Sequence, residues 1–383
     1  MRVAINAFFW GQTTTGSGQY LHHLVHALRR TRPDIALILL GDTAATRRAH
    51  TTPPPNDVGW RHVPTPFDTL HPHLAKVWFE QVGAPRAAQA VQADVYHVPY
   101  FAPPLQAPLP VVATVHDLIP LLLPAYRGNW LVRLYTALVA HAARRTPRLL
   151  ADSEATRRDI LTHLRVPAER VQTVYLATDI QPPTPDAVAA VRTRYALPES
   201  YALYLGGFDV RKRVPLLIRA LARTSGDWTL VIAGRLPQSD TDFTPDPRRV
   251  AETLGVAHRL HFCGFVPDEE KPALIGGARL FVFPSVYEGF GLPVLEALAC
   301  GVPVITTTAS SLPEVAGNAG VLVPPDDETS LAQALDRLMQ DDALHAQLAA
   351  EAVRQAARFS WNATARATAH VYETLTTQQA STN

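Results

Sequence analysis

Two glutamates, Glu288 and Glu296, stand eight positions apart on either side of a glycine-containing run in VYEGFGLPVLEALACGVPVI (residues 286–305). Paired carboxylates at this spacing allow three interpretations: the acid/base pair of a glycosidase, two groups that hold ligand hydroxyls, or two solvated charges. The glycines let backbone amides approach a ligand, and Pro293 suits the first turn of a helix whose amino end attracts anions. An anion-attracting helix end disfavours a neutral glycan. The segment therefore favours a phosphate site flanked by two carboxylates, with solvated charges as the alternative.

A basic cluster, Arg211, Lys212 and Arg213, follows the double glycine in YLGGFDVRKRVPLLIRAL (residues 204–221). Cations placed after a strand can neutralise a diphosphate at the carboxyl edge of a sheet. Lys212 is one of only three lysines in a chain with 32 arginines, which favours a specific role. A solvated basic turn would give the same pattern, so both interpretations stay open.

His116 ends the apolar run VVATVH, with Asp117 directly after it. At the carboxyl end of a strand, a histidine can donate a hydrogen bond to a substrate hydroxyl or transfer a proton. A satisfied structural histidine is the alternative, because the chain has 15 histidines. None of their spacings resembles a metal site, so we predict no bound metal.

A third glycine-containing segment, INAFFWGQTTTGSGQYLHHL (residues 5–24), includes Gly16, Ser17 and Gly18. Leu21 occupies the third glycine position of a dinucleotide-binding fingerprint, and the preceding loop is longer than the tight turn that this fingerprint needs. We therefore expect a flexible loop that covers a ligand and no nicotinamide cofactor.

These segments must be positioned by strands and helices that alternate along the chain. Such alternation is typical of parallel sheets built from βαβ units. The predicted strands are residues 2–6, 35–41, 95–99, 111–117, 148–153, 201–207, 229–234, 259–264, 279–285 and 303–308. At 383 residues the chain exceeds the roughly 250–300 residues at which one core usually splits. We predict two α/β domains, 1–178 and 197–359, each a doubly wound parallel sheet, which face a cleft and are joined by a proline-rich linker at 179–196.

Composition excludes several classes of protein. A net charge of +1 gives no field to gather nucleic acid. Two cysteines cannot form a disulfide framework, and no run of about 20 apolar residues predicts a membrane span. The expected location is the cytoplasm. Two interpretations of the segment NWLVRLYTALVAHAARR (residues 129–145) stay open. Its apolar face could contact the inner face of the membrane, or, more simply, it could be part of the core.

Taken together, the motifs resemble those of retaining glycosyltransferases of family 4, which have two Rossmann-like domains in the GT-B arrangement. The resemblance extends over nearly the whole chain and is closest to a subgroup that includes many mannosyltransferases. The segments that carry it are TVHDLIPLLLP, ADSEATRRDI, GGFDVRKRVPLLIRAL, FCGFVPDEEKPAL, FVFPSVYEGFGLPVLEALACGVPVI and SSLPEVAGNAGVLVPPDD.

The resemblance implies a role for each candidate residue. Glu288 and His116 would contact the donor sugar, Glu296 the ribose, and Arg211 with Lys212 the diphosphate. Many members carry an arginine where this chain has Gly207, so Arg211 is expected to supply that cation. The remaining contacts would come from Gly16, Ser17 and Gly18 closing over the donor, from Gly264 and Phe265 near the base, and from the backbone of Gly289, Phe290, Gly291 and Leu292.

The terminal segment is helical in pattern, and we expect this helix, at about 360–383, to pack on the first domain. The implied reaction is retaining transfer of a hexose, with mannose from GDP-mannose favoured, to a glycan, lipid-linked or small-molecule acceptor in polysaccharide biosynthesis. It would use neither a metal nor a separate cofactor. Two alternatives remain: a sugar-nucleotide-binding subunit without turnover, and a phosphorylase or epimerase of the same architecture. Oligomeric state is not predicted.

Overall fold

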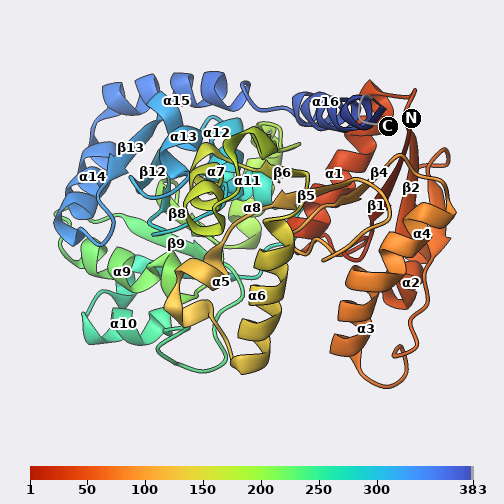
Figure 1. Cartoon of the computed structure of the whole chain (residues 1–383). Coiled ribbons are helices and arrows are strands. Elements are labelled where there is room, and N and C mark those ends of the chain that lie inside the picture. Colours follow the sequence, from red (N-terminus) through yellow and green to blue (C-terminus); the bar gives the residue numbers. More distant parts are fainter. Residues whose placement is uncertain (381–383) are drawn as a thin grey trace. The chain divides into compact units, whose positions relative to one another are not determined.

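The structure, a computed structural model, describes residues 1–380 and divides them into two α/β units (Figure 1). Unit 1 consists of Met1–Leu176 and the described residues from Ser360 onward, and unit 2 is Ala177–Phe359. Unit 2 thus begins two residues before the predicted linker at 179–196. That segment contains a helix of unit 2, α8 (Pro185–Arg194), which Thr184 caps and Pro185 begins. Prolines that indicate a linker are equally suited to the first turn of a helix.

Unit 1 is built on a seven-stranded parallel sheet in the order β3-β2-β1-β4-β5-β6-β7. Its strands are β1 (Arg2–Asn6), β2 (Ala36–Gly41), β3 (Gly59–His62), β4 (Val95–Val98), β5 (Val111–Val115), β6 (Arg148–Ala151) and β7 (Val171–Thr173). The apolar runs predicted the five inner strands. The two edge strands, GWRH and VQT, carry mostly exposed or half-buried side chains, so they lack the apolar pattern by which a strand is recognised.

Several α-helices accompany this sheet in unit 1. They are α1 (Gly16–Thr31), α2 (Thr43–Thr51), α3 (Pro72–Trp78), α4 (Ala84–Ala90), α5 (Ile119–Leu122), α6 (Trp130–Ala143), α7 (Glu154–Asp159) and α16 (Trp361–Ala380). Helix α16 lies beside α1 (Figure 1). Trp361 stacks on His23 with ring centroids 4.8 Å apart, and the Tyr372 hydroxyl lies 2.6 Å from His97 Nδ1. The chain therefore returns to unit 1 after completing unit 2; residues 381–383 of the predicted terminal helix lie outside the described residues.

Unit 2 is built on a six-stranded parallel sheet in the order β10-β9-β8-β11-β12-β13. Its strands are β8 (Tyr201–Leu205), β9 (Thr229–Ala233), β10 (Leu260–Gly264), β11 (Leu280–Phe283), β12 (Val304–Thr307) and β13 (Gly320–Val323). Its further helices are α9 (Val214–Ala222), α10 (Pro247–Thr253), α11 (Lys271–Gly276), α12 (Leu292–Ala299), α13 (Leu312–Ala316), α14 (Glu328–Gln340) and α15 (Asp342–Ala356). The partly exposed edge strand β13 was not predicted. In the sheet, β8 pairs with β11 and β11 with β12, so their carboxyl ends adjoin.

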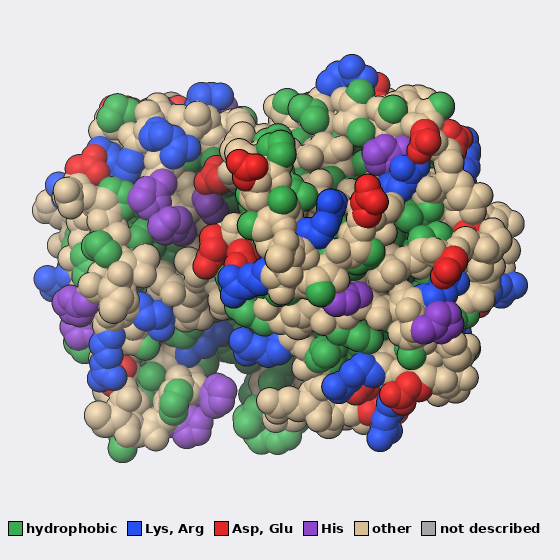
Figure 2. Space-filling model, turned by 180° about the vertical axis from the view of Figure 1, so that it is seen from behind, with side chains coloured by type: hydrophobic (Ala, Val, Ile, Leu, Met, Phe, Trp, Pro, Cys, Tyr) green, Lys and Arg blue, Asp and Glu red, His purple; other side chains and the backbone are tan. Residues whose placement is uncertain are grey.

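Charges on the surface are mixed in sign. Figure 2 shows basic and acidic side chains interspersed over one face, in keeping with the net charge of +1. Within residues 1–380, no helix combines the length and the apolarity that a membrane span requires.

Candidate active site

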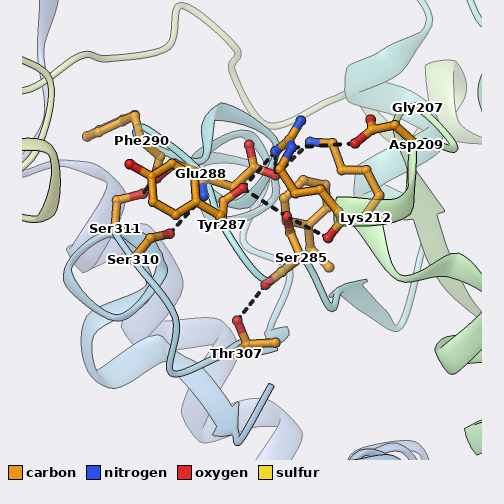
Figure 3. A network of polar contacts seen from close by, with 12 residues as sticks. Gly207, Asp209, Lys212, Ser285, Tyr287, Glu288, Phe290, Thr307, Ser310 and Ser311 are labelled. Carbon is orange, nitrogen blue, oxygen red and sulfur yellow. Dashed lines mark hydrogen bonds and ion pairs between the residues drawn. The ribbon is translucent and has the colours of Figure 1, made fainter. Parts of the chain in front are cut away.

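A buried group of opposite charges lies at the carboxyl edge of the unit 2 sheet (Figure 3). Glu288 follows β11, and Arg211 and Lys212 follow the neighbouring strand β8. Lys212 Nζ donates to Glu288 Oε1 over 2.7 Å, and Arg211 Nη1 lies 2.5 Å from the same oxygen. Each of the three side chains is only 12% exposed. The sheet thus brings together two motifs that are 76 positions apart in sequence.

The charges in this group determine one another's ionisation. Burial alone would raise the pKa of Glu288, but the charges of Lys212 and Arg211 outweigh it and hold that pKa below its usual value. Burial lowers the pKa of Lys212, with Arg211 adding to the effect and Glu288 opposing it. Asp209 Oδ1 lies 3.4 Å from Arg211 Nε and supplies a second negative charge. Two cations and two carboxylates of the protein therefore balance one another.

Two serines hold the loop that carries Glu288. Ser310 Oγ accepts from Glu288 N–H over 2.8 Å, and Ser311 Oγ lies 2.9 Å from the Glu288 carbonyl and 2.7 Å from that of Phe290. Both serines follow β12, whose carboxyl end adjoins that of β11. Ser310 and Ser311 belong to the segment SSLPEV and were not among the predicted site residues. Their signal was the one used for the other motifs, namely polar residues directly after a buried strand.

The backbone between the two glutamates is fixed by glycine. Gly291 has φ +106 and directly precedes α12, and a Cβ there would lie 3.0 Å from Leu312. Within the described part of the chain, no side chain caps the amino end of α12. The ring of Phe290 is buried against Phe359, with centroids 5.6 Å apart, so Phe290 can offer a ligand only its backbone. Gly289 and Leu292 complete this turn, and the segment 289–292 presents backbone groups at the helix amino end.

Glu296 lies in α12 and is half-buried. Among residues 1–380 its carboxylate has no hydrogen-bond or ion-pair partner in the protein. Burial raises its pKa to about 7, with Lys271 opposing the shift and Asp268 adding to it. Glu288 is therefore a paired carboxylate, whereas Glu296 is an unpaired one that titrates near neutral pH.

Two further candidate regions follow β8 and β10. Gly207 accepts a hydrogen bond at its carbonyl from the Tyr204 hydroxyl, and a Cβ at this position would meet only Asp209 Oδ2, at 3.5 Å. Gly264 has φ +68 at the end of β10. The Phe265 ring is 57% exposed, and Arg235 lies over it with 5.6 Å between Cζ and the ring centroid. An exposed aromatic ring beside an arginine offers a stacking surface for a planar base.

In unit 1, His116 lies directly after β5. Its Nδ1 is 2.7 Å from Asp152 Oδ2, its Nε2 is 3.1 Å from the Pro99 carbonyl oxygen, and its ring packs edge-on against Tyr20. Burial alone would lower the pKa of His116, but Asp152 outweighs it and raises that pKa. Asp152 was not among the predicted site residues.

The segment Gly16, Ser17 and Gly18 differs from the prediction of a flexible loop. It forms the first turn of α1, because Thr15 Oγ1 accepts from Gly18 N–H over 3.2 Å and caps the helix. A Cβ on Gly18 would lie 2.0 Å from the Gln12 carbonyl oxygen, so glycine is required there by close packing. The loop of this region is the stretch before Thr15.

Comparison with known proteins bears on both units. Residues 14–182 match the family model "Glycosyltransferase Family 4", and residues 192–355 match "Glycosyl transferases group 1". The O-antigen chain mannosyltransferase B of Escherichia coli is 33% identical over 289 residues, which are 73% of this chain and 74% of that protein. The MMP alpha-(1->4)-mannosyltransferase of Mycolicibacterium hassiacum is 34% identical over 279 residues, 69% of this chain and 65% of that protein.

Among solved structures, HepE of Anabaena in complex with UDP aligns with 98% of this chain and 100% of its own, with a TM-score of 0.74 and 20% identity. The chain has two Rossmann-like units with parallel sheets of seven and six strands, and it aligns over nearly its whole length with HepE. These features define the GT-B fold. The chain belongs to glycosyltransferase family 4, and it is similar to the mannosyltransferases of that family.

Proposed function

We propose that this glycosyltransferase moves mannose from GDP-mannose to a glycan, lipid-linked or small-molecule acceptor, with retention of configuration at the anomeric carbon. The observation that carries the proposal is the buried group of Arg211, Lys212 and Glu288 at the carboxyl edge of the unit 2 sheet, where ligands of open α/β sheets bind. Mannose is supported by the two relatives described above, both of which are mannosyltransferases. A nucleoside diphosphate is supported by the UDP complex of HepE.

In the proposed complex, each group meets the part of the donor that suits its charge. Arg211 and Lys212 would pair with the diphosphate, and the backbone of residues 289–292 at the amino end of α12 would bind a phosphate or the sugar. Ionised Glu288 would accept hydrogen bonds from hydroxyls of the sugar, and Glu296 from those of the ribose. The exposed ring of Phe265 would lie near the base.

The reaction follows from the charge that develops on the leaving group. As the bond between the anomeric carbon and the diphosphate oxygen breaks, Arg211 and Lys212 would stabilise the negative charge that develops on the nucleoside diphosphate. The acceptor oxygen would form its bond to the same face of the anomeric carbon, while its proton passes to the departing phosphate oxygen. The products are the mannosylated acceptor and GDP. No protein nucleophile takes part, and the positive charge comes from side chains, so the proposal includes no metal ion.

Two other functions fit the same architecture. A sugar-nucleotide-binding subunit would bind GDP-mannose without turnover, and a phosphorylase would release sugar 1-phosphate. The ion pairs at 2.5 and 2.7 Å, which fix both cations beside one carboxylate, favour an ordered catalytic site over a binding surface.

The test has two stages. Thermal shift with GDP-, UDP- and ADP-sugars should give the largest stabilisation with GDP-mannose, because a ligand that binds only the folded protein raises its apparent stability. NMR of the product of the chosen donor should then show an α-linked mannoside and release of GDP. Binding without turnover would support the subunit, sugar 1-phosphate the phosphorylase, and a β-mannoside would overturn retention.

We also propose that the enzyme acts in the cytoplasm at the inner face of the membrane. The amino-terminal half of α6 exposes Trp130, Leu131 and Leu134 by 69%, 55% and 61%, and Arg133 lies among them. An exposed tryptophan beside a basic residue suits the boundary between anionic headgroups and acyl chains. Flotation with vesicles that contain 30% anionic lipid should recover the protein, and Trp130→Ser should reduce the recovery. Equal recovery of both proteins would contradict this location.

A further inference from the structure

The hydrogen bonds of His116 determine how many protons its ring carries. One ring nitrogen faces the Asp152 carboxylate at 2.7 Å, and the other faces the Pro99 carbonyl at 3.1 Å. A carboxylate and a carbonyl oxygen only accept hydrogen bonds, so both bonds require an N–H on the imidazole. A neutral imidazole has one N–H and would leave two acceptors facing each other. This geometry is therefore that of a doubly protonated imidazolium.

The other groups around the ring agree with a positive charge on it. Asp117, the next residue after His116, adds a second negative charge. On β4, burial lowers the pKa of His97 to about 3, so His97 is neutral and does not compete for the charge. On α1, Tyr20 touches the ring edge-on, and its hydroxyl bonds to Thr114. Burial raises the pKa of Tyr20 above its usual value, so it stays uncharged.

We propose that Asp152 is a positioning residue that holds His116 as a fixed, doubly protonated hydrogen-bond donor, so that in the transfer reaction His116 donates to a substrate oxygen and takes no proton. This inference rests on the function proposed above, because only a sugar substrate gives His116 a role. It decides between the two roles that sequence reasoning left open, donor and proton shuttle.

A substrate hydroxyl can replace one of the two acceptors without a change in protonation. The His116 side chain is 20% exposed, and its bond to the uncharged Pro99 carbonyl is the longer of the two, at 3.1 Å against 2.7 Å to the Asp152 carboxylate. The Pro99 carbonyl is therefore the partner that a ligand would replace. The bond to Asp152 would persist and keep the ring plane in place. The ring keeps two acceptors in this exchange, but the buried Pro99 carbonyl loses its bond to His116, so the bond to the substrate must offset that loss.

The first experiment measures the protonation of His116 directly and needs no substrate. In the full chain labelled with ¹⁵N, the His116 signals, assigned by their loss in His116→Gln, should show two protonated ring nitrogens at pH 7. In Asp152→Asn the ring should be neutral at pH 7, because the amide carries no charge and can donate as well as accept. A neutral ring in the unmodified protein, or an unchanged charge in Asp152→Asn, would overturn the proposal.

The second experiment compares pH profiles of kcat/KM for transfer from GDP-mannose. The unmodified enzyme should lose activity at high pH with the pKa that NMR assigns to His116. In Asp152→Asn this loss of activity should move to lower pH and again follow the pKa that NMR assigns to His116. Relative to the unmodified enzyme, kcat/KM should decrease by about tenfold at pH 8 and by less at pH 6, which is the effect of losing one charge-assisted hydrogen bond. An equal decrease at every pH would indicate a merely structural role and overturn the proposal.

A control variant and the order of the two experiments separate the causes of failure. Asp34→Asn changes a carboxylate of unit 1 that is 61% exposed and pairs with Arg32, and it should leave both readouts unchanged. A chain that transfers no sugar with any donor would contradict the proposed function. The NMR experiment would still decide whether Asp152 fixes the protonation of His116.

Discussion

Glu288 Oε1 lies 2.7 Å from Lys212 Nζ, so the carboxylate after β11 neutralises the lysine after β8. Arg211 shares the same oxygen. The cations that the proposed function assigns to a diphosphate are thus already paired with an internal anion. In the proposed complex, a diphosphate would take over part of this pairing, and Glu288 would then be released toward the sugar.

Replacing Glu288, the internal anion, should have opposite effects on binding of the product GDP and on the rate of transfer. We expect Glu288→Gln to bind GDP several-fold more tightly, because the uncharged amide no longer competes for Lys212 and Arg211. Transfer from GDP-mannose should fall by about tenfold or more, because a charge-assisted contact to the sugar is lost. Calorimetry with GDP and initial rates check the two halves. Glu351→Gln, a change in the surface pair with Arg354, is the control, and weaker GDP binding in Glu288→Gln would contradict this account.

The space at Gly207 allows a cation to be added. A Cβ there would meet only Asp209 Oδ2, at 3.5 Å, and the backbone lies outside the left-handed region. Gly207→Arg should therefore fold normally and strengthen GDP binding by about three- to tenfold, with a steeper dependence on salt concentration. Titrations at two salt concentrations measure both effects. Gly207→Ala should match the unmodified protein, and tighter binding in that variant would show that charge is not the cause.

Glu296 should make stability depend on pH. Burial raises its pKa in the folded protein to about 7, from an ordinary value of 4.5. The raised pKa thus contributes to the free energy of unfolding. This contribution is fully present below pH 4.5, where the carboxyl is protonated, and it is lost as the pH rises through 7. Glu296→Gln should leave the free energy of unfolding nearly unchanged at pH 4.5 and raise it at pH 8 by on the order of 2 kcal/mol, as one pKa unit is about 1.4 kcal/mol. Urea unfolding at the two pH values tests this, and equal effects at both would contradict it.

The same carboxylate should couple nucleotide binding to proton release. If ribose hydroxyls donate to Glu296, the ionised form is required, and GDP binding near pH 7 should release a fraction of a proton. Calorimetry in two buffers of different ionisation enthalpy measures that fraction. Glu296→Gln should abolish the release and weaken GDP binding while it stabilises the free protein. Proton release that persists in the variant would assign it to another group.

We expect the Ser311 side chain to hold the loop that carries Glu288 in the conformation that transfer requires. Its hydroxyl is fully buried between the carbonyls of Glu288 and Phe290. Ser311→Ala leaves those buried acceptors without this donor, so we expect a loss of about 1–2 kcal/mol in the free energy of unfolding and a lower kcat. Denaturant unfolding and kinetics on the same preparation check both. A fully stable variant with normal kcat would show that the hydroxyl does not hold the Glu288 loop.

Local patterns identified the inner strands but missed three edge strands. Strands β3, β7 and β13 are short and partly exposed, and they are held by backbone hydrogen bonds to a neighbour that no local pattern reveals. The proline cluster at 179–196 likewise did not show that residues 185–194 continue as a helix. Thr15 as a cap was not recognised, so Gly16–Gly18 was predicted as a loop where the structure has a helical turn.

By itself, the sequence determined the two parallel-sheet α/β units and the positions of its candidate residues after strands, because apolar periodicity and residue type are local properties of the chain. Only the tertiary structure decided which of these residues meet. Lys212 and Glu288 are 76 positions apart, and His116 and Asp152 are 36 apart, and each pair forms because neighbouring parallel strands end at one edge of a sheet. The charge states of Glu288, Glu296 and His116 follow from those contacts and from burial, which depend on the folded chain.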